Sequence, residues 1–177
     1  MSIVLNILLA ISVTLDSFIV GKSVDKKINF TLLCITLSHV VLFFIGLKLG
    51  NQIAPFIGPY DHWFSFIIFL FLALSSYKDL ISHEPILRLD NLYKILITTF
   101  VLSLDAFAVA TSTQHEIKFP ILVLVLIALF APLFCYLGFK LKNEIIKHSH
   151  KLLHFSEGTF FLVIGSSILY SHITGGY

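Results

Sequence analysis

Charged residues are scarce in this chain of 177 residues, because Asp, Glu, Lys and Arg make up only 12% of it. An ordinary soluble domain has roughly 25%. Hydrophobic residues make up 57%, and the mean hydropathy is +0.95. The net charge of +2 is too small to indicate a nucleic-acid partner. The composition therefore excludes an ordinary soluble protein and predicts an integral membrane protein.

Cysteine is also rare, and the two present, Cys34 and Cys135, lie inside apolar stretches, where a thiol usually packs as a small hydrophobic group. They indicate no disulfide framework. A nucleotide-binding loop is lacking, so we expect no direct coupling to ATP. The alternation of period two that is typical of membrane β-barrels is lacking as well. Because backbone amides in lipid must be paired within each segment, we expect an all-α fold.

Long apolar stretches occupy nearly the whole sequence. A helix needs about 20 apolar residues to cross a bilayer, and the chain offers six such stretches with short loops between them. We therefore expect six transmembrane helices in a single membrane domain, residues 1–177, with no water-soluble domain beside it. The predicted spans are residues 2–21, 30–50, 63–80, 92–112, 119–140 and 155–172.

Basic residues are distributed unevenly between the two predicted faces of the membrane. All Lys and Arg except Lys48 and Lys118 fall in or beside the first, third and fifth loops. Lys and Arg concentrate in cytoplasmic loops. We therefore expect these three loops in the cytoplasm and both termini outside it.

The two halves of the chain share two motifs. Residues 14–21, Thr-Leu-Asp-Ser-Phe-Ile-Val-Gly, match residues 103–110, Ser-Leu-Asp-Ala-Phe-Ala-Val-Ala, and residues 44–50 match residues 136–142 at nearly the same offset. Repeats are typical of transporter folds, which bind substrate near the midplane where the repeats meet. Each unit holds three helices, so the second copy enters the membrane from the opposite face. The sequence thus predicts inverted repeats, covering residues 1–82 and 91–177.

The repeated motifs carry two carboxylates, Asp16 and Asp105, in the interior of the first and fourth spans. A carboxylate near the bilayer centre costs roughly 2.5 to 3.5 kcal/mol on insertion scales. No Lys or Arg lies deep enough in a span to pair with either, so a cation or a proton is the expected partner. Mg²⁺ and Mn²⁺ prefer such oxygen ligands. We interpret Asp16 and Asp105 as the centre of a cation site.

His39, in the middle of the second span, is a third candidate for this site, because an imidazole can bind a transition metal or relay a proton. Hydroxyl groups four or seven residues from an aspartate share its face on a straight helix and could add oxygen ligands. The alternative is that they bond back to the helix backbone. Glu157 is expected at the membrane interface, from where it could reach a site toward the cytoplasm. The possible secondary ligands are Ser12, Thr98, Ser103, Ser112 and Glu157.

A short tract before the last span contains His148, His150 and His154. It could be a cytoplasmic metal antenna. The neighbouring Lys147 and Lys151 favour the alternative, a solvated helix in contact with anionic lipid.

The two Asp motifs and the six-span layout resemble the MntP family of manganese efflux pumps, small exporters of the bacterial inner membrane. The motifs are Thr-Leu-Asp-Ser-Phe at residues 14–18 and Leu-Ser-Leu-Asp-Ala-Phe-Ala-Val-Ala at residues 102–110, and the resemblance extends along nearly the whole chain. It implies a transporter rather than an enzyme, with Mn²⁺ as the substrate and no cofactor. It also implies that Asp16 and Asp105 lie in the metal path.

Two features depart from the family pattern. His39 stands where the family usually has a Glu, which softens the ligand set and moves the expected preference from Mn²⁺ toward Fe²⁺, Co²⁺ or Zn²⁺. Ala73 and Ala110 stand where glycines are expected, which reduces close helix approach.

Three other functions stay open. The cargo could be another divalent metal, such as Fe, Co, Zn or Cd, or a cationic amino acid. A more remote alternative is an intramembrane aspartyl protease, which also uses two membrane aspartates. The Gly-x-Gly-Asp context of those proteases is absent, since Ser103 and Leu104 precede Asp105.

Overall fold

The computed structural model describes residues 3–57, 60–81, 89–141 and 148–174. Within these ranges the chain is all-α and contains no strand, apart from one isolated bridge between Val24 and Leu89. The helices are α1 (Ile3–Thr14), α2 (Ser17–Ser23), α3 (Ile28–Ile57), α4 (Asp61–Ile81), α5 (Leu92–Leu102), α6 (Leu104–Thr113), α7 (Pro120–Lys140) and α8 (His148–Ile173).

Five helical stretches of the described chain are long and apolar enough to cross a membrane. They correspond to five of the six predicted spans. The third predicted span, residues 63–80, lies within α4, which is helical throughout but is not among the five. The five are Ile3–Ser23, Ile28–Ile57, Leu92–Thr113, Pro120–Lys140 and Lys151–Ile173.

The first and fourth spans are each broken near their aspartate, so the expectation of straight helices is wrong for these two. The break between α1 and α2 lies at Leu15 and Asp16, and the break between α5 and α6 lies at Ser103. Just before the first break the Thr14 hydroxyl donates to the Ala10 carbonyl at 2.7 Å, and at the second the Ser103 hydroxyl donates to the Thr99 carbonyl at 2.7 Å. Such back-bonding often bends helices, and neither break contains Gly or Pro.

Glycines bring the broken spans into backbone contact with their neighbours. A Cβ at Gly138 of α7 would collide with the Phe18 carbonyl of α2, and a Cβ at Gly46 of α3 would collide with the Phe107 carbonyl of α6. The expected loss of close approach at Ala110 does not occur here, because Gly46 lies directly against the Ala110 side chain. These contacts hold α2 against α7 and α3 against α6.

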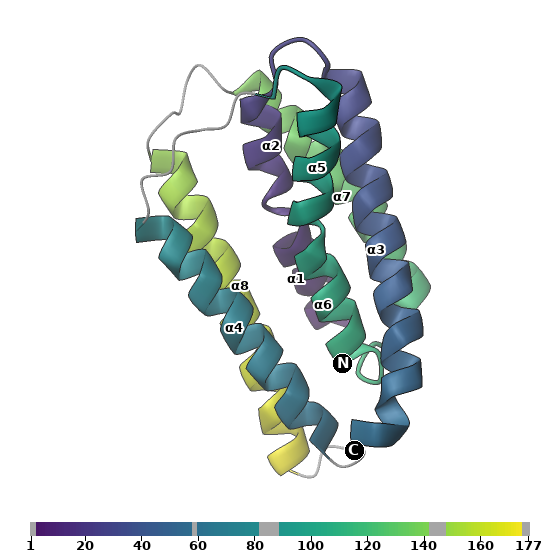
Figure 1. Cartoon of the computed structure of the whole chain (residues 1–177). Coiled ribbons are helices and arrows are strands. Elements are labelled where there is room, and N and C mark those ends of the chain that lie inside the picture. Colours follow the sequence, from purple (N-terminus) through teal and green to yellow (C-terminus); the bar gives the residue numbers. More distant parts are fainter. Residues whose placement is uncertain (1–2, 58–59, 82–88, 142–147, 175–177) are drawn as a thin grey trace.

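The helices α4 and α8 form a pair that packs mainly against itself. They make the most extensive helix–helix contact in the described chain and stand to one side of the other helices (Figure 1). Phe69 and Phe161 meet in its middle with ring centroids 6.0 Å apart. Nearer the end where α4 begins and α8 ends, His62 stacks on His172 with centroids 3.6 Å apart. The opposite end of the pair points toward the same end of the bundle as the turn from α2 to α3 (Figure 1).

The contact of α2 with α7 gives the first prediction. Gly138→Ala places a methyl group against the Phe18 backbone, which cannot move aside as a flexible side chain would. We expect a loss of stability of about 1 to 3 kcal/mol, as for other overpacked sites. Thermal unfolding of the purified protein in detergent measures it. Leu129→Ala on the exposed face of α7 is the control, and equal unfolding temperatures for the two variants would contradict this packing.

Candidate metal site

Three side chains far apart in the sequence meet in the bundle interior. Asp16 comes from the break between α1 and α2, His39 from the middle of α3, and Asp105 from the first turn of α6. One potential ligand atom from each lies within 4.8 Å of the other two. Asp16 and His39 are buried, and Asp105 is partly exposed. The three residues predicted as the centre of the site are therefore neighbours in space.

Asp16 lies at the first break, directly before α2. It occupies the N-cap position of α2 but makes no side-chain capping hydrogen bond. The Ser17 hydroxyl lies 3.5 Å from Oδ1. Oδ2 is buried and has no hydrogen-bond partner among the described residues. A buried carboxylate oxygen without a hydrogen bond costs free energy. A cation that bound to Oδ2 would remove this cost.

His39 is fixed by contacts from three directions. Its Nε2 lies 3.5 Å from Asp16 Oδ1 and 3.1 Å from the Val13 carbonyl. Its Nδ1 lies 3.0 Å from the Ile35 carbonyl and 2.7 Å from the Ser103 hydroxyl. Carbonyl oxygens only accept hydrogen bonds, so each ring nitrogen faces a group that favours an N–H. To bind a metal through Nε2, the ring must therefore give up its contact with Val13.

Asp105 lacks the histidine contact that Asp16 has. Its Oδ1 accepts the Ala106 backbone N–H at 2.6 Å. Within the described part of the chain it forms no ion pair. Of the two aspartates, Asp105 is the one whose charge has no compensating group in contact with it.

The hydroxyl groups predicted as secondary ligands differ in what they contact. Ser103 contacts His39, as described above, but the Ser12 hydroxyl donates to the Leu8 carbonyl at 2.7 Å and the Ser112 hydroxyl to the Val109 carbonyl at 3.0 Å. Thr98 is half-buried on α5 and does not line the cavity described next. The break at Leu15 and Asp16 separates Ser12 from Asp16, and the break at Ser103 separates Thr98 from Asp105, so the straight-helix register does not apply to these two. Ser112 lies on α6 together with Asp105, and its hydroxyl bonds back to the helix instead.

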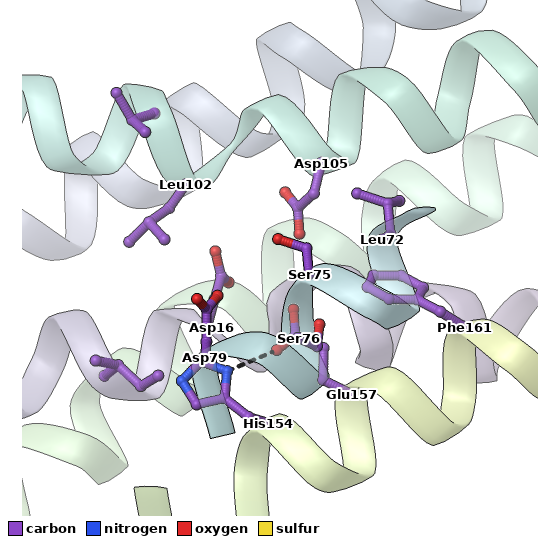
Figure 2. A pocket seen from close by; sticks show the side chains of 12 residues that line it. Asp16, Leu72, Ser75, Ser76, Asp79, Leu102, Asp105, His154, Glu157 and Phe161 are labelled. Carbon is purple, nitrogen blue, oxygen red and sulfur yellow. Dashed lines mark ion pairs between the residues drawn. The ribbon is translucent and has the colours of Figure 1, made fainter. Parts of the chain in front are cut away.

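A cavity of about 160 Å³ adjoins the two aspartates and reaches α4 and α8 (Figure 2). Glu157 faces it and is buried, so its side chain reaches the cavity beside the aspartates. Ser75, Ser76 and Asp79 of α4 also line it, and sequence reasoning missed them because they stand near the polar end of an apolar stretch. The described residues that line it are Asp16, Ile19, Leu72, Ser75, Ser76, Asp79, Val101, Leu102, Asp105, His154, Glu157 and Phe161.

The interpretation of the histidine tract as a solvated, lipid-contacting segment is wrong for His154. This side chain is buried, and its Nδ1 lies 3.4 Å from Glu157 Oε2 (Figure 2). The one-turn spacing of these two residues on α8 directs both toward the cavity. The side chains of His148 and His150 lie outside the described residues.

The unequal surroundings of the two aspartates give the second prediction. Asp16→Asn leaves His39 buried without its acidic partner, so we expect it to destabilise the metal-free protein by about 3 kcal/mol. Asp105→Asn removes a carboxylate with no ion pair, so we expect no loss of stability. Thermal unfolding in detergent with a chelator present compares them. A larger loss for Asp105→Asn would show that the pairing is assigned to the wrong aspartate.

Comparison with known proteins gives a consistent family. The profile of the family described as "Putative manganese efflux pump" matches residues 22–169, a range that includes His39, Asp105 and Glu157 and begins just after Asp16. No solved structure matches the chain significantly.

Three similar proteins all carry the description "Putative manganese efflux pump MntP". That of Desulfitobacterium hafniense (strain Y51) is 26% identical over 183 residues, covering 94% of this chain and 93% of the relative. That of Elusimicrobium minutum (strain Pei191) is 24% identical, covering 82% and 84%. That of Dehalococcoides mccartyi (strain CBDB1) is 28% identical, covering 74% and 70%. Since the family profile spans most of its length and several of its helices can cross a membrane, the chain is a multi-pass membrane protein that belongs to the MntP family, a family of efflux pumps and not of enzymes.

Proposed function

We propose that this protein is a secondary transporter that exports divalent manganese from the cytoplasm. The observation that carries the proposal is the meeting of Asp16, His39 and Asp105, with ligand atoms within 4.8 Å of one another. Membership of a family whose relatives are described as manganese efflux pumps supports the choice of substrate.

The dimensions of the cluster suit one divalent ion. Oxygen and nitrogen ligands lie about 2.0 to 2.6 Å from such metals, so two ligands on opposite sides of an ion are about 4 to 5 Å apart. The donor atoms of Asp16, His39 and Asp105 are no farther apart than this, since all lie within 4.8 Å of one another. An ion between them would also contact the unpartnered Oδ2 of Asp16 and balance the charge of Asp105. Two carboxylates and an imidazole match the ligand preferences of Mn²⁺ and its neighbours in the first transition series.

We further propose six crossings arranged as two inverted repeats in one domain, residues 1–82 and 91–177. In support, the aspartate motif of each half lies at a helix break, and the matched glycines make matched contacts, Gly46 with Phe107 and Gly138 with Phe18. The third helices of the two halves, α4 and α8, pair with each other. This pairing is also the argument that α4 crosses the membrane alongside α8. Broken helices meeting at a midplane site are typical of transporters built from inverted repeats.

The proposed orientation has the odd-numbered loops in the cytoplasm and both termini outside, in the inner membrane of a bacterium. The excess of Lys and Arg in these loops supports it. The starting end of α1 and the finishing end of α8 lie at the same end of the bundle (Figure 1), as an even number of crossings requires. In this orientation the cavity lies on the cytoplasmic side of Asp16 and Asp105, where the ion would enter.

The transport prediction uses the two aspartates. In a manganese exporter-deficient bacterium, Asp105→Asn is expected to reduce Mn²⁺ resistance to that of cells without the protein, because the variant loses a charged ligand. Asp16→Asn is expected to do the same. The control is Asp90→Asn, which alters an exposed aspartate whose partner is Lys94 at 2.8 Å. Membrane levels are compared by immunoblot.

Full resistance in both aspartate variants would refute the proposal. Inside-out vesicles distinguish the cargo: uptake of Mn²⁺ supports it, whereas uptake of lysine without Mn²⁺ indicates a cationic amino acid exporter.

The contacts of His39 give a prediction on metal choice. His39→Glu replaces the nitrogen ligand with an oxygen ligand, so we expect protection to move toward Mn²⁺ and away from Co²⁺ and Zn²⁺. Growth across a series of Mn, Fe, Co, Zn and Cd concentrations measures the change. His62→Gln is the matched control, because His62 is a buried histidine that does not line the cavity. An unchanged metal profile for His39→Glu would mean that His39 does not contact the ion.

A further inference from the structure

The cavity beside Asp16 and Asp105 contains a second group of potential ligands. We infer that Glu157 and His154 of α8, with Asp79 of α4 at the mouth, form a second divalent-cation site on the cytoplasmic side of the proposed transport site. We call it the vestibule site. It rests on the proposed function for its role in transport, but it can be tested by metal binding alone.

The geometry places two donors together on one helix. His154 Nδ1 and Glu157 Oε2 are 3.4 Å apart, and both side chains are about nine-tenths buried. The residues are three positions apart, so they share a face of α8, and that face lines the cavity. Across the cavity, α4 contributes the Ser75 and Ser76 hydroxyls and the Asp79 carboxylate (Figure 2). A cation here would find one nitrogen and several oxygen donors from two helices.

The charge of the lining selects a cation. Among the described residues, four carboxylates line the cavity, those of Asp16, Asp79, Asp105 and Glu157, and no described Lys or Arg lines it. Asp16, whose buried Oδ2 has no hydrogen-bond partner in the described chain, is one of these lining residues. In a medium of low dielectric constant this surplus of negative charge attracts a divalent ion more than a monovalent one. The volume of about 160 Å³ leaves room for part of the hydration shell, which Mg²⁺ in particular gives up reluctantly.

Exposure varies among the lining residues, and Asp105 of the proposed transport site is itself partly exposed. Asp79 and Ser75 are exposed, whereas Glu157 and Ser76 are buried. Asp16, which belongs to the proposed transport site, is buried at 5% exposure. In the proposed path, an ion leaves water at the exposed Asp79 and is held at Glu157 and His154 before it reaches the aspartates. With two successive sites, the ion loses its hydration water in two steps instead of one. A transported ion must also bind each site well enough to enter it and weakly enough to leave it.

The test counts Mn²⁺ bound to purified protein in detergent, by electron paramagnetic resonance of the free ion. The variant with Asp16→Asn and Asp105→Asn lacks the proposed transport site, and we expect it to retain one bound Mn²⁺. Addition of Glu157→Gln is expected to abolish this remaining binding. Asp105→Asn alone serves as the background if the double variant does not fold. Absence of Mn²⁺ binding in a folded aspartate variant would overturn the inference.

The control for Glu157→Gln is Glu116→Gln. Glu116 is another buried glutamate, at 8% exposure like Glu157, but it does not line the cavity. In the background without the transport site, Glu116→Gln should leave the bound Mn²⁺ in place. Equal loss from both glutamate variants would indicate a general effect on folding and overturn the assignment to Glu157.

Transport kinetics provide a second readout. In inside-out vesicles, Glu157→Gln is expected to raise the Mn²⁺ concentration for half-maximal uptake about tenfold, the lower end of what loss of a group near a metal costs. The maximal rate should change little, and Glu157→Asp should restore part of the affinity. An unchanged half-maximal concentration would overturn the inference.

The two proposals fail in different ways. If Asp105→Asn abolishes resistance but binds no Mn²⁺, the transport site stands and the vestibule site does not. If the aspartate variants keep full resistance while still binding Mn²⁺ through Glu157, the vestibule site stands and the transport proposal does not.

Discussion

A carboxylate in an apolar interior must be compensated, and the arrangement around Asp16 follows from that requirement. The Asp16 side chain lies 3.5 Å from His39 Nε2, and the ring is held on its other side by Ile35 and Ser103. The contact draws together the first break, the middle of α3 and the second break. It compensates Asp16 only in part, because Oδ2 stays without a partner in the described structure and Asp105 lies close by with no ion pair. The cluster is thus incomplete without a further positive charge.

The packing of the bundle preserves this incomplete cluster. Gly46 and Gly138 allow α3 and α7 to touch the backbone of the helices that follow the two breaks. These contacts hold α2 and α6 in place although each is short and separated from the preceding helix. Rigid support of this kind is what a binding site needs if its ligands are to stay within ion-binding distance. The same small residues also explain why Ala110, where a glycine was expected, fits against α3.

The membrane class and the helical fold could be predicted from the long apolar stretches of the sequence. The three central residues could be predicted because polar side chains are rare within such stretches. A charged or imidazole side chain within an apolar span has few explanations, so Asp16, Asp105 and His39 stand out. The helix breaks could not be predicted in the same way, since hydroxyl residues such as Thr14 and Ser103 also occur in unbroken membrane helices. The error affected Ser12 and Thr98, whose expected positions assumed straight helices, whereas Ser112 shares α6 with Asp105 and bonds back to the helix backbone. His154 and Glu157 depended on the packing of α8 against α4, which periodicity alone does not reveal.

The separate pairing of α4 and α8 has a mechanical consequence. These two helices contact each other more extensively than they contact the rest of the bundle. They therefore form one unit, the arm, beside a second unit, the block, which consists of the other helices. The cavity lies at the junction, with one wall on the arm and the other on the block (Figure 2). A small tilt of the arm therefore widens or closes the passage to the aspartates while both parts keep their internal packing, and no helix has to unwind for the cavity to change shape.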